Sequence, residues 1–209
     1  MINTILVEDD LYIQKHFAER LKSNRDFRLV GVYRDAFEAE RNCSGSIHLI
    51  LMDVQTQHKH SGLAAAQRIK KAFPNIKIVV VTSLVDPEVL SKAKNGAADS
   101  LWYKDTDEET MVDVIRRTMQ GEHIFPDAPP PVNVGTAKST EFTKTELRIL
   151  RYIVKGMSYA KIAEELGVEV TTVKYHVTNM LQKTNFKNKL QLALAVTDVK
   201  LIAELADDE

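Results

Sequence analysis

The run LILMD at residues 49–53 decides the fold of this chain of 209 residues. Its four apolar residues are not interrupted by a polar one, which is typical of a strand buried on both faces, as in a parallel sheet covered by helices. Similar short runs recur up to about His123 and alternate with segments of helical periodicity. This alternation predicts an α/β unit with a doubly wound, five-stranded parallel sheet.

We predict strands at residues 3–7, 28–33, 47–52, 76–81 and 100–103, and helices at residues 11–22, 35–42, 63–73, 87–95 and 107–120. Four prolines and a glycine then interrupt the pattern, so residues 125–140 are expected to be a linker. Beyond the linker every pattern is helical, beginning at a capping box formed by Thr143 and Glu146. The prediction is therefore a first domain at 1–124 and an all-α, four-helix domain at 141–209.

The composition limits the possible functions. A formal net charge of −1 argues against coating nucleic acid through bulk charge but leaves room for a local basic surface. The single cysteine, Cys43, cannot form an internal disulfide, which fits a reducing compartment. We find no signal-peptide layout and no apolar stretch long enough to cross a bilayer, and we therefore expect a cytoplasmic protein without membrane contact.

Polar residues follow four of the five predicted strands, at the edge where loops of a parallel sheet bind ligands. They are Glu8, Asp9, Asp53, Thr82 and Lys104. Each alone is explained by a turn, a helix cap or a solvated charge. Together, three crowded carboxylates favour a hard dication such as Mg²⁺. A carboxylate can also capture a phosphoryl group whose charge is neutralised by metal, ammonium and hydroxyl donors.

Four motifs at these strand ends make roughly the first 120 residues resemble a CheY-like receiver, a flavodoxin-like fold of the response-regulator superfamily. The motifs are ILVEDD (5–10), LILMD (49–53), VVTS (80–83) and YKD (103–105). The resemblance implies that Asp53 is the phosphoacceptor and that Thr82 and Lys104 contact the phosphoryl oxygens. It also implies Mg²⁺ as the cofactor, held by Glu8, Asp9, Asp53 and the backbone carbonyl of Gln55.

The chain departs from such receivers after the phosphoacceptor. Thr56 and Gln57 stand where methionine and proline are usual, and the loop at 58–62 is one residue longer, so we expect a more mobile loop and unusual phosphorylation kinetics. Leu101 stands where an aromatic residue is common, and the usual aromatic switch is therefore not carried over. His58 and His60 have the alternate spacing of a transition-metal pair. Because that spacing alone gives no complete ligand set, we expect them to be merely exposed.

A helix-turn-helix spacing follows the linker. Helices are predicted at 158–165 and 171–184, separated by a turn that contains Gly167. Any helical hairpin has this spacing, but residues 171–190 hold four lysines and no acidic residue, which a solvated helix face would normally include. One stripe of the second helix is apolar, and the opposite face carries Thr171, Tyr175, Thr178 and Gln182. Such hydroxyls and amides, edged by lysines, suit the base edges and phosphates of a DNA major groove.

Residues from 142 to about 196 resemble the LuxR-type DNA-binding domain. The shared stretches are FTKTEL (142–147), GMS (156–158), IA (162–163), TVKYH (172–176) and NMLQK (179–183). The resemblance implies that Lys174, Tyr175 and Thr178 approach bases, and that Thr172 and Lys183 lie near phosphates. It also implies a fourth helix at 189–196 that pairs with its twin in a homodimer. Glu169 replaces the usual serine-like cap of the reading helix.

Receiver, linker and this DNA-binding type, in this order, resemble the NarL/FixJ class of response regulators. The resemblance implies a transcription regulator and not an enzyme: a cognate sensor histidine kinase phosphorylates the receiver, and the phosphorylated dimer binds double-stranded promoter DNA. An aspartate-nucleophile phosphatase or NTPase is disfavoured because the chain lacks the second aspartate of a D-x-D motif and a phosphate-binding G-x-x-x-x-G-K loop. A receiver that is never phosphorylated is disfavoured by the complete set of carboxylates, threonine and lysine.

Overall fold

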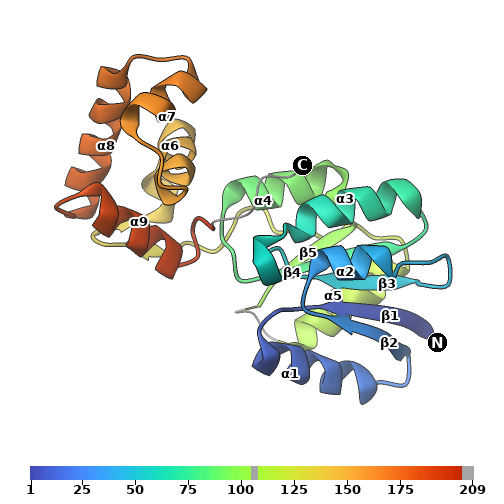
Figure 1. Ribbon diagram of the computed structural model, residues 1–209. Coiled ribbons are helices and arrows are strands. Elements are labelled where there is room, and N and C mark those ends of the chain that lie inside the picture. Colours follow the sequence, from blue (N-terminus) through green and yellow to red (C-terminus); the bar gives the residue numbers. More distant parts are fainter. Residues whose placement is uncertain (105–107, 204–209) are drawn as a thin grey trace. The chain divides into compact units, whose positions relative to one another are not determined.

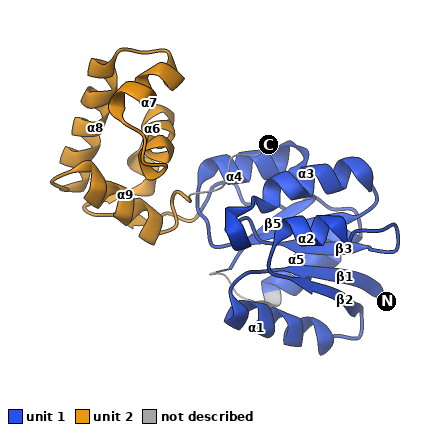
Figure 2. Ribbon diagram, viewed as in Figure 1, with its two compact units in different colours: residues 1–129, 205–209 blue, residues 130–204 orange. Residues whose placement is uncertain are grey.

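The computed structural model describes residues 1–104 and 108–203. Within these residues the chain forms two compact units, and the boundary between them in the sequence falls between Pro129 and Pro130 (Figure 2). Asp105 of the YKD motif, Asp107, at which we expected the fifth helix to begin, and residues 204–209 at the end of the predicted second domain lie outside the described residues.

The first unit contains a parallel sheet with the strand order β2-β1-β3-β4-β5 (Figure 1). The strands are β1 (Ile2–Val7), β2 (Phe27–Tyr33), β3 (Leu49–Met52), β4 (Lys77–Thr82) and β5 (Ser100–Tyr103). All four residues of the central strand β3 are 0% exposed. The uninterrupted apolar run therefore forms the strand that is buried on both faces, and the predicted doubly wound sheet is confirmed.

Five helices cover the two faces of this sheet. α1 (Leu11–Lys22) and α5 (Glu108–Met119) lie on one face, and α2 (Ala36–Arg41), α3 (Gly62–Ala72) and α4 (Pro87–Lys92) lie on the other (Figure 1). Side chains of Asp10, Asp35, Ser61 and Asp86 accept hydrogen bonds from the first backbone N–H groups of α1 to α4. These caps fix where each helix begins after its strand, and so they fix the course of the loops at that edge.

The core between the sheet and the α1–α5 layer holds the strands in place. Because strand residues alternate between the two faces, every second side chain points into this core. Leu6, Leu51, Val79, Val81 and Trp102 from the sheet pack there with Phe17 and Leu21 of α1 and Met111 and Ile115 of α5. Burying each large apolar side chain stabilises the fold by about 1.5–3 kcal/mol. The strand ends that carry the polar residues are therefore rigidly supported.

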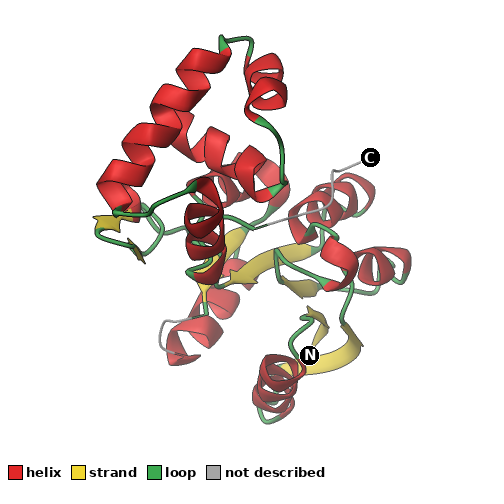
Figure 3. Cartoon of the chain, turned by 60° about the vertical axis from the view of Figure 1, so that its left-hand side comes forward, coloured by secondary structure: helices red, strands yellow, loops and turns green. Residues whose placement is uncertain are grey.

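The second unit is helical and contains α6 (Lys144–Val154), α7 (Tyr159–Leu166), α8 (Val170–Thr184) and α9 (Lys189–Asp198) (Figure 3). The capping box of Thr143 and Glu146 is present at the start of α6, as predicted. Gly167, with φ +65°, ends α7 in the left-handed conformation and forms the turn before α8. None of the helices within residues 1–104 and 108–203 combines the length and the apolar character needed to span a membrane.

Part of the expected linker is folded. Within residues 125–140, β6 (Asn133–Val134) and β7 (Ala137–Lys138) form an antiparallel hairpin that belongs to the second unit. The Thr136 N–H and hydroxyl donate to the carbonyls of Thr184 (3.2 Å) and Lys183 (2.9 Å). Gly135, with φ +59°, packs so closely that an added Cβ would lie 2.1 Å from the Thr184 carbonyl oxygen. The hairpin thus satisfies carbonyls left free at the end of α8.

Candidate functional site

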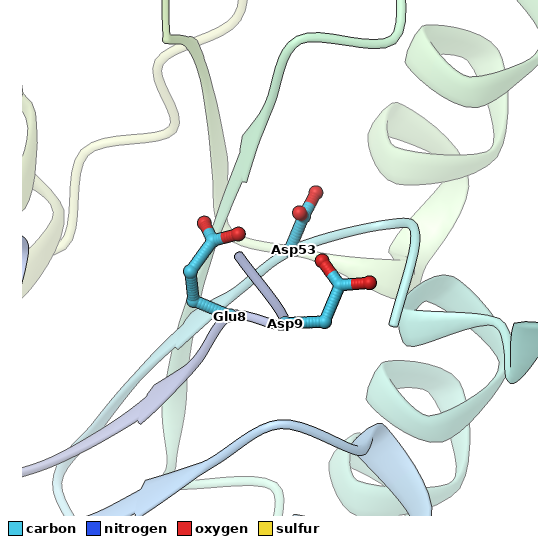
Figure 4. A group of neighbouring side chains, drawn as sticks. All are labelled: Glu8, Asp9 and Asp53. Carbon is cyan, nitrogen blue, oxygen red and sulfur yellow. The ribbon is translucent and has the colours of Figure 1, made fainter. Parts of the chain in front are cut away.

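Three carboxylates gather where β1 and β3 end (Figure 4). Glu8 and Asp9 follow β1 and Asp53 follows β3, and one carboxylate oxygen from each of the three lies within 4.8 Å of the other two. The Asp53 N–H donates to the Val7 carbonyl (3.0 Å), which joins the two strand ends. Oxygen ligands in this arrangement suit Mg²⁺, which takes one or two carboxylates and keeps several waters. The structure therefore brings together the three carboxylates that the sequence indicated.

Lys104 lies among these carboxylates. Its Nζ atom is 2.6 Å from Glu8 Oε2 and 2.6 Å from Asp53 Oδ2. Its backbone N–H donates to the Thr82 carbonyl (3.0 Å), which holds the end of β5 beside β4. Burial lowers the pKa of Lys104, but the two carboxylates outweigh this effect and keep the pKa above its ordinary value. The side chain is therefore a buried ammonium that two acidic groups share.

Burial makes the carboxylates costly to ionise. Glu8 is 1% exposed and Asp53 is 5% exposed. Burial and then the charge of Asp53 raise the pKa of Glu8 to about 7, in spite of the attraction of Lys104. Burial also raises the pKa of Asp53, although Lys104 and the Val54 N–H, 2.7 Å from Oδ1, act in the opposite direction. A divalent cation among these groups would relieve the cost.

Thr82 and Gln55 stand near the same edge of the sheet. Thr82 is the last residue of β4 and is 1% exposed. Its hydroxyl oxygen accepts from the Leu84 N–H (3.1 Å), which leaves the hydroxyl proton for an anionic acceptor. Gln55 lies two residues after Asp53 and pairs with Ser61 in an isolated β-bridge. That the Gln55 carbonyl is a metal ligand stays a prediction.

Gly62 is a site residue that the sequence reasoning missed. Its N–H donates to the Val54 carbonyl (2.9 Å), and an added Cβ would lie 1.8 Å from the Asp53 carbonyl oxygen. The first turn of α3 therefore passes directly against the backbone of Asp53, where only glycine fits. The sequence carried only a weak signal, a glycine directly before the predicted helix at 63–73, where glycine is a common residue.

The loop after Asp53 is anchored to the segment before α2. The Thr56 hydroxyl accepts from the Ala36 N–H (3.2 Å) and donates to the His60 carbonyl (2.8 Å). His60 Nδ1 lies 2.8 Å from Asp35 Oδ1. Side chains thus restrain the base of this loop, and the expected higher mobility of the loop stays a prediction.

α8 presents the polar surface that its sequence predicts. Val173, Val177 and Met180 are at most 2% exposed, and their burial fixes the rotation of the helix. The predicted contact residues Thr171, Thr172, Lys174, Tyr175, Thr178 and Gln182 are all exposed. Glu169 is the N-cap residue, but its side chain makes no capping hydrogen bond. A continuous face of hydroxyl, amide, phenol and ammonium groups is thus open to a large ligand.

Lys183 differs from the rest of this predicted set. Its Nζ atom lies 3.0 and 3.1 Å from the two carboxylate oxygens of Glu146 and 2.8 Å from the Glu141 carbonyl oxygen. The ammonium also lies over the ring of Phe142, 5.2 Å from its centroid. Lys183 therefore joins α8 to the start of α6, and its position favours this structural role over the phosphate contact that the resemblance implied.

α9 carries two exposed leucines. Leu190 and Leu194 are 65% and 63% exposed, whereas Leu192 and Val196 are fully buried against the second unit. Because Leu190 and Leu194 are four residues apart, they lie on the same face of the helix. An apolar stripe therefore faces outward on the helix for which the resemblance implied dimerisation.

Comparison with protein families agrees with this arrangement of two units. A model described as "Response regulator receiver domain" matches residues 4–116, and one described as "Bacterial regulatory proteins, luxR family" matches residues 140–196. The response regulator protein VraR of Staphylococcus aureus (strain Mu3 / ATCC 700698) is 28% identical over 207 residues, which covers 96% of this chain and 99% of the relative.

Solved structures of two further proteins have the same fold. RcsB from Salmonella enterica serovar Typhimurium, bound to promoter rprA in the presence of the phosphomimetic BeF3-, matches with a TM-score of 0.59 and 18% identity, covering 95% of this chain and 100% of that one. The response regulator ChrA of a heme-sensing two-component system matches with a TM-score of 0.52 and 18% identity, covering 94% and 96%. At these identities the likeness supports the fold alone.

Proposed function

We propose, on the premise that this chain belongs to the NarL/FixJ class of two-component response regulators, that Asp53 accepts a phosphoryl group and thereby controls DNA binding by α8. The chain is a DNA-binding transcription regulator with a receiver and a LuxR-type domain, and its relatives are regulators and not enzymes. The observation that carries the proposal is the Lys104 ammonium, 2.6 Å from both Glu8 and Asp53. We propose a receiver at 1–124, a connecting segment at 125–140, whose hairpin belongs to the second compact unit, and a DNA-binding domain at 141–209.

Glu8, Asp9, Asp53 and the Gln55 carbonyl would hold Mg²⁺. When bound, the ion supplies positive charge to the carboxylates and to the oxygens of the incoming phosphoryl group. The Asp53 carboxylate is the nucleophile, and the donor is a phosphohistidine of a cognate sensor histidine kinase. Lys104, whose Nζ atom lies 2.6 Å from Asp53 Oδ2, would pair with a phosphoryl oxygen, and the Thr82 hydroxyl would donate to another.

The new charge at Asp53 would act on the two strand ends that meet it. Thr82 and Lys104 are joined through the backbone, so a shift of one carries the other. We infer that this shift changes the populations of a form that does not bind DNA and a form that does. Leu190 and Leu194 of α9 would then pair with the same residues of a second copy to form a homodimer.

The exposed face of α8 would enter the major groove of double-stranded promoter DNA. On this proposal Lys174, Tyr175 and Thr178 would contact bases and Thr172 a phosphate, with Thr171 and Gln182 on the same face; the exposure of all six side chains supports it. We propose that the protein works in the cytoplasm, since both promoter DNA and the phosphoryl-donating part of a sensor kinase would have to be within its reach.

The coupling of the two units is tested by selecting bound genomic DNA with and without acetyl phosphate. The full chain should enrich a set of promoter fragments only with the donor, and Asp53→Asn should not. Lys174→Ala should weaken binding by about 1–3 kcal/mol at constant salt, whereas Lys144→Ala, an equal loss of charge at an exposed position of α6, should have a much smaller effect. Equal enrichment with and without acetyl phosphate, or an unchanged DNA affinity for Lys174→Ala, would contradict the proposal.

A further inference from the structure

The loop after Asp53 carries two imidazoles that lie close together. The ring centroids of His58 and His60 are 5.9 Å apart, with planes inclined at 56°. With metal–nitrogen bonds of about 2.0–2.1 Å, two imidazoles on one ion have centroids roughly 5–6 Å apart. The separation of the two rings is therefore compatible with one shared ion. His58 is exposed and the His60 side chain is 41% exposed, which leaves room for water as further ligand.

Asp35 supports His60 as a carboxylate supports a metal-binding histidine. His60 Nδ1 is 2.8 Å from Asp35 Oδ1, and the Asp35 side chain is only 9% exposed. Asp35 is itself held in place, because it accepts from the Phe37 N–H (2.9 Å) as the N-cap of α2. With Nδ1–H donated to this carboxylate, Nε2 of His60 is the nitrogen that remains for a metal. This outer hydrogen bond is the usual partner of a histidine ligand.

The backbone between the two histidines is strained. His58 and Lys59 have φ values of 62° and 63°, in the left-handed region that residues with a side chain rarely adopt. Each such residue costs on the order of 1–2 kcal/mol and persists only where the surrounding structure enforces it. The Gln55–Ser61 bridge closes the base of the loop. The loop is thus held in a costly conformation whose tip carries the two imidazoles.

We propose that His58 and His60 bind one transition-metal ion of the class that prefers imidazole, such as Zn²⁺, with Asp35 as the supporting hydrogen-bond acceptor. The spacing of the histidines alone indicated no complete ligand set; water can complete it because both rings are accessible, and the Asp35 contact, which orients the His60 ring, is the observation that favours binding. The site is separate from the acidic site, whose oxygen ligands suit Mg²⁺ and not a soft ion. A bound ion would fix the tip of the loop that begins two residues after Asp53.

The test is a titration of Zn²⁺ into the full chain with saturating Mg²⁺, read by calorimetry and by the shifts of the histidine ring protons in NMR spectra. One ion should bind per chain, and the ring protons of His58 and His60 should move together. His58→Ala and His60→Ala should each weaken binding at least tenfold. Asp35→Asn should weaken it about 10–100-fold through the lost orientation of the ring. Asparagine is also a good N-cap, so this variant keeps α2 folded.

His176→Gln is the matched control, because it removes an imidazole from α8, and its affinity for Zn²⁺ should be unchanged. Two results would overturn the proposal. One is the absence of stoichiometric Zn²⁺ binding in the presence of Mg²⁺. The other is binding that survives His60→Ala but is lost in Asp53→Asn, which would place the ion in the acidic site.

Discussion

Neutralising Glu8 should stabilise the first unit in the absence of Mg²⁺. Glu8 is 1% exposed, and its pKa is raised to about 7 from an ordinary 4.5 by burial and by the charge of Asp53. At roughly 1.4 kcal/mol for each pH unit, ionised Glu8 costs the folded state about 3 kcal/mol at pH 8. The amide of Glu8→Gln must still be buried, so we expect a net gain of about 2 kcal/mol.

The sign of the pH dependence follows from the raised pKa. Below pH 4.5 the carboxyl is protonated in both the folded and the unfolded chain, so the variant has no advantage. As the pH rises from 4.5 through 7 the wild-type protein loses stability and Glu8→Gln does not. The difference between them should therefore grow over this window and stay constant above it.

Urea denaturation followed by tryptophan fluorescence measures this effect in the first unit alone. Trp102 is the single tryptophan of the chain and is 4% exposed in the core beneath the site. The control is Glu19→Gln, an exposed position on α1, which should change stability by no more than about 0.5 kcal/mol. Equal or lower stability of Glu8→Gln at pH 8 in chelator, or a difference that is the same at pH 5 and pH 8, would refute the reasoning. Added Mg²⁺ should stabilise the wild type more than the variant.

Three further outcomes are expected. In thermal melts, Gly62→Ala should destabilise the first unit by at least about 3 kcal/mol, because the added Cβ would lie 1.8 Å from the Asp53 carbonyl oxygen, and it should slow phosphorylation. The control Gly45→Ala, whose added Cβ would have no atom within 4 Å, should leave stability unchanged. Mg²⁺ affinity should fall by up to about tenfold per pH unit below pH 7, because the ion must displace the proton that Glu8 then carries. Calorimetry in buffers of different ionisation enthalpy should detect the released proton. Lys183→Met should destabilise the second unit by about 1–3 kcal/mol in thermal melts, because it leaves the buried Glu146 carboxylate without its ammonium. It should weaken DNA binding less than Lys174→Ala does. A larger loss of DNA affinity for Lys183→Met than for Lys174→Ala would show that Lys183 contacts a phosphate.

The sheet and its acidic edge were predictable because their signals are local. A short uninterrupted apolar run that alternates with helical segments is typical of a strand buried on both faces, and the carboxyl ends of parallel strands meet at one edge of the sheet. β5 has the predicted bounds, as does α1, whose start is marked by the cap at Asp10. The contact of Lys104 with Glu8 and Asp53 depends on the strand order β2-β1-β3-β4-β5, which the sequence pattern alone did not give.

The features that were missed depend on the path of the chain in space. Lys183 contacts Glu146, which lies 37 residues earlier in the sequence, and nothing near Lys183 in the sequence distinguishes it from the other lysines of this region. The hairpin within the expected linker has strands of two residues, too short for any periodic pattern. Gly62 matters because α3 begins against the Asp53 carbonyl, a distance that no sequence pattern encodes.

Chemical location of the phosphoryl group tests the account most directly. The full chain is treated with acetyl phosphate with and without Mg²⁺, the acyl phosphate is reduced with borohydride to an alcohol, and the peptides are sequenced by mass spectrometry. We predict reduction at Asp53 alone, in samples that contained Mg²⁺. A modified residue elsewhere, or an equal yield at Asp53 when Mg²⁺ is removed by chelator, would contradict the assignment of this site.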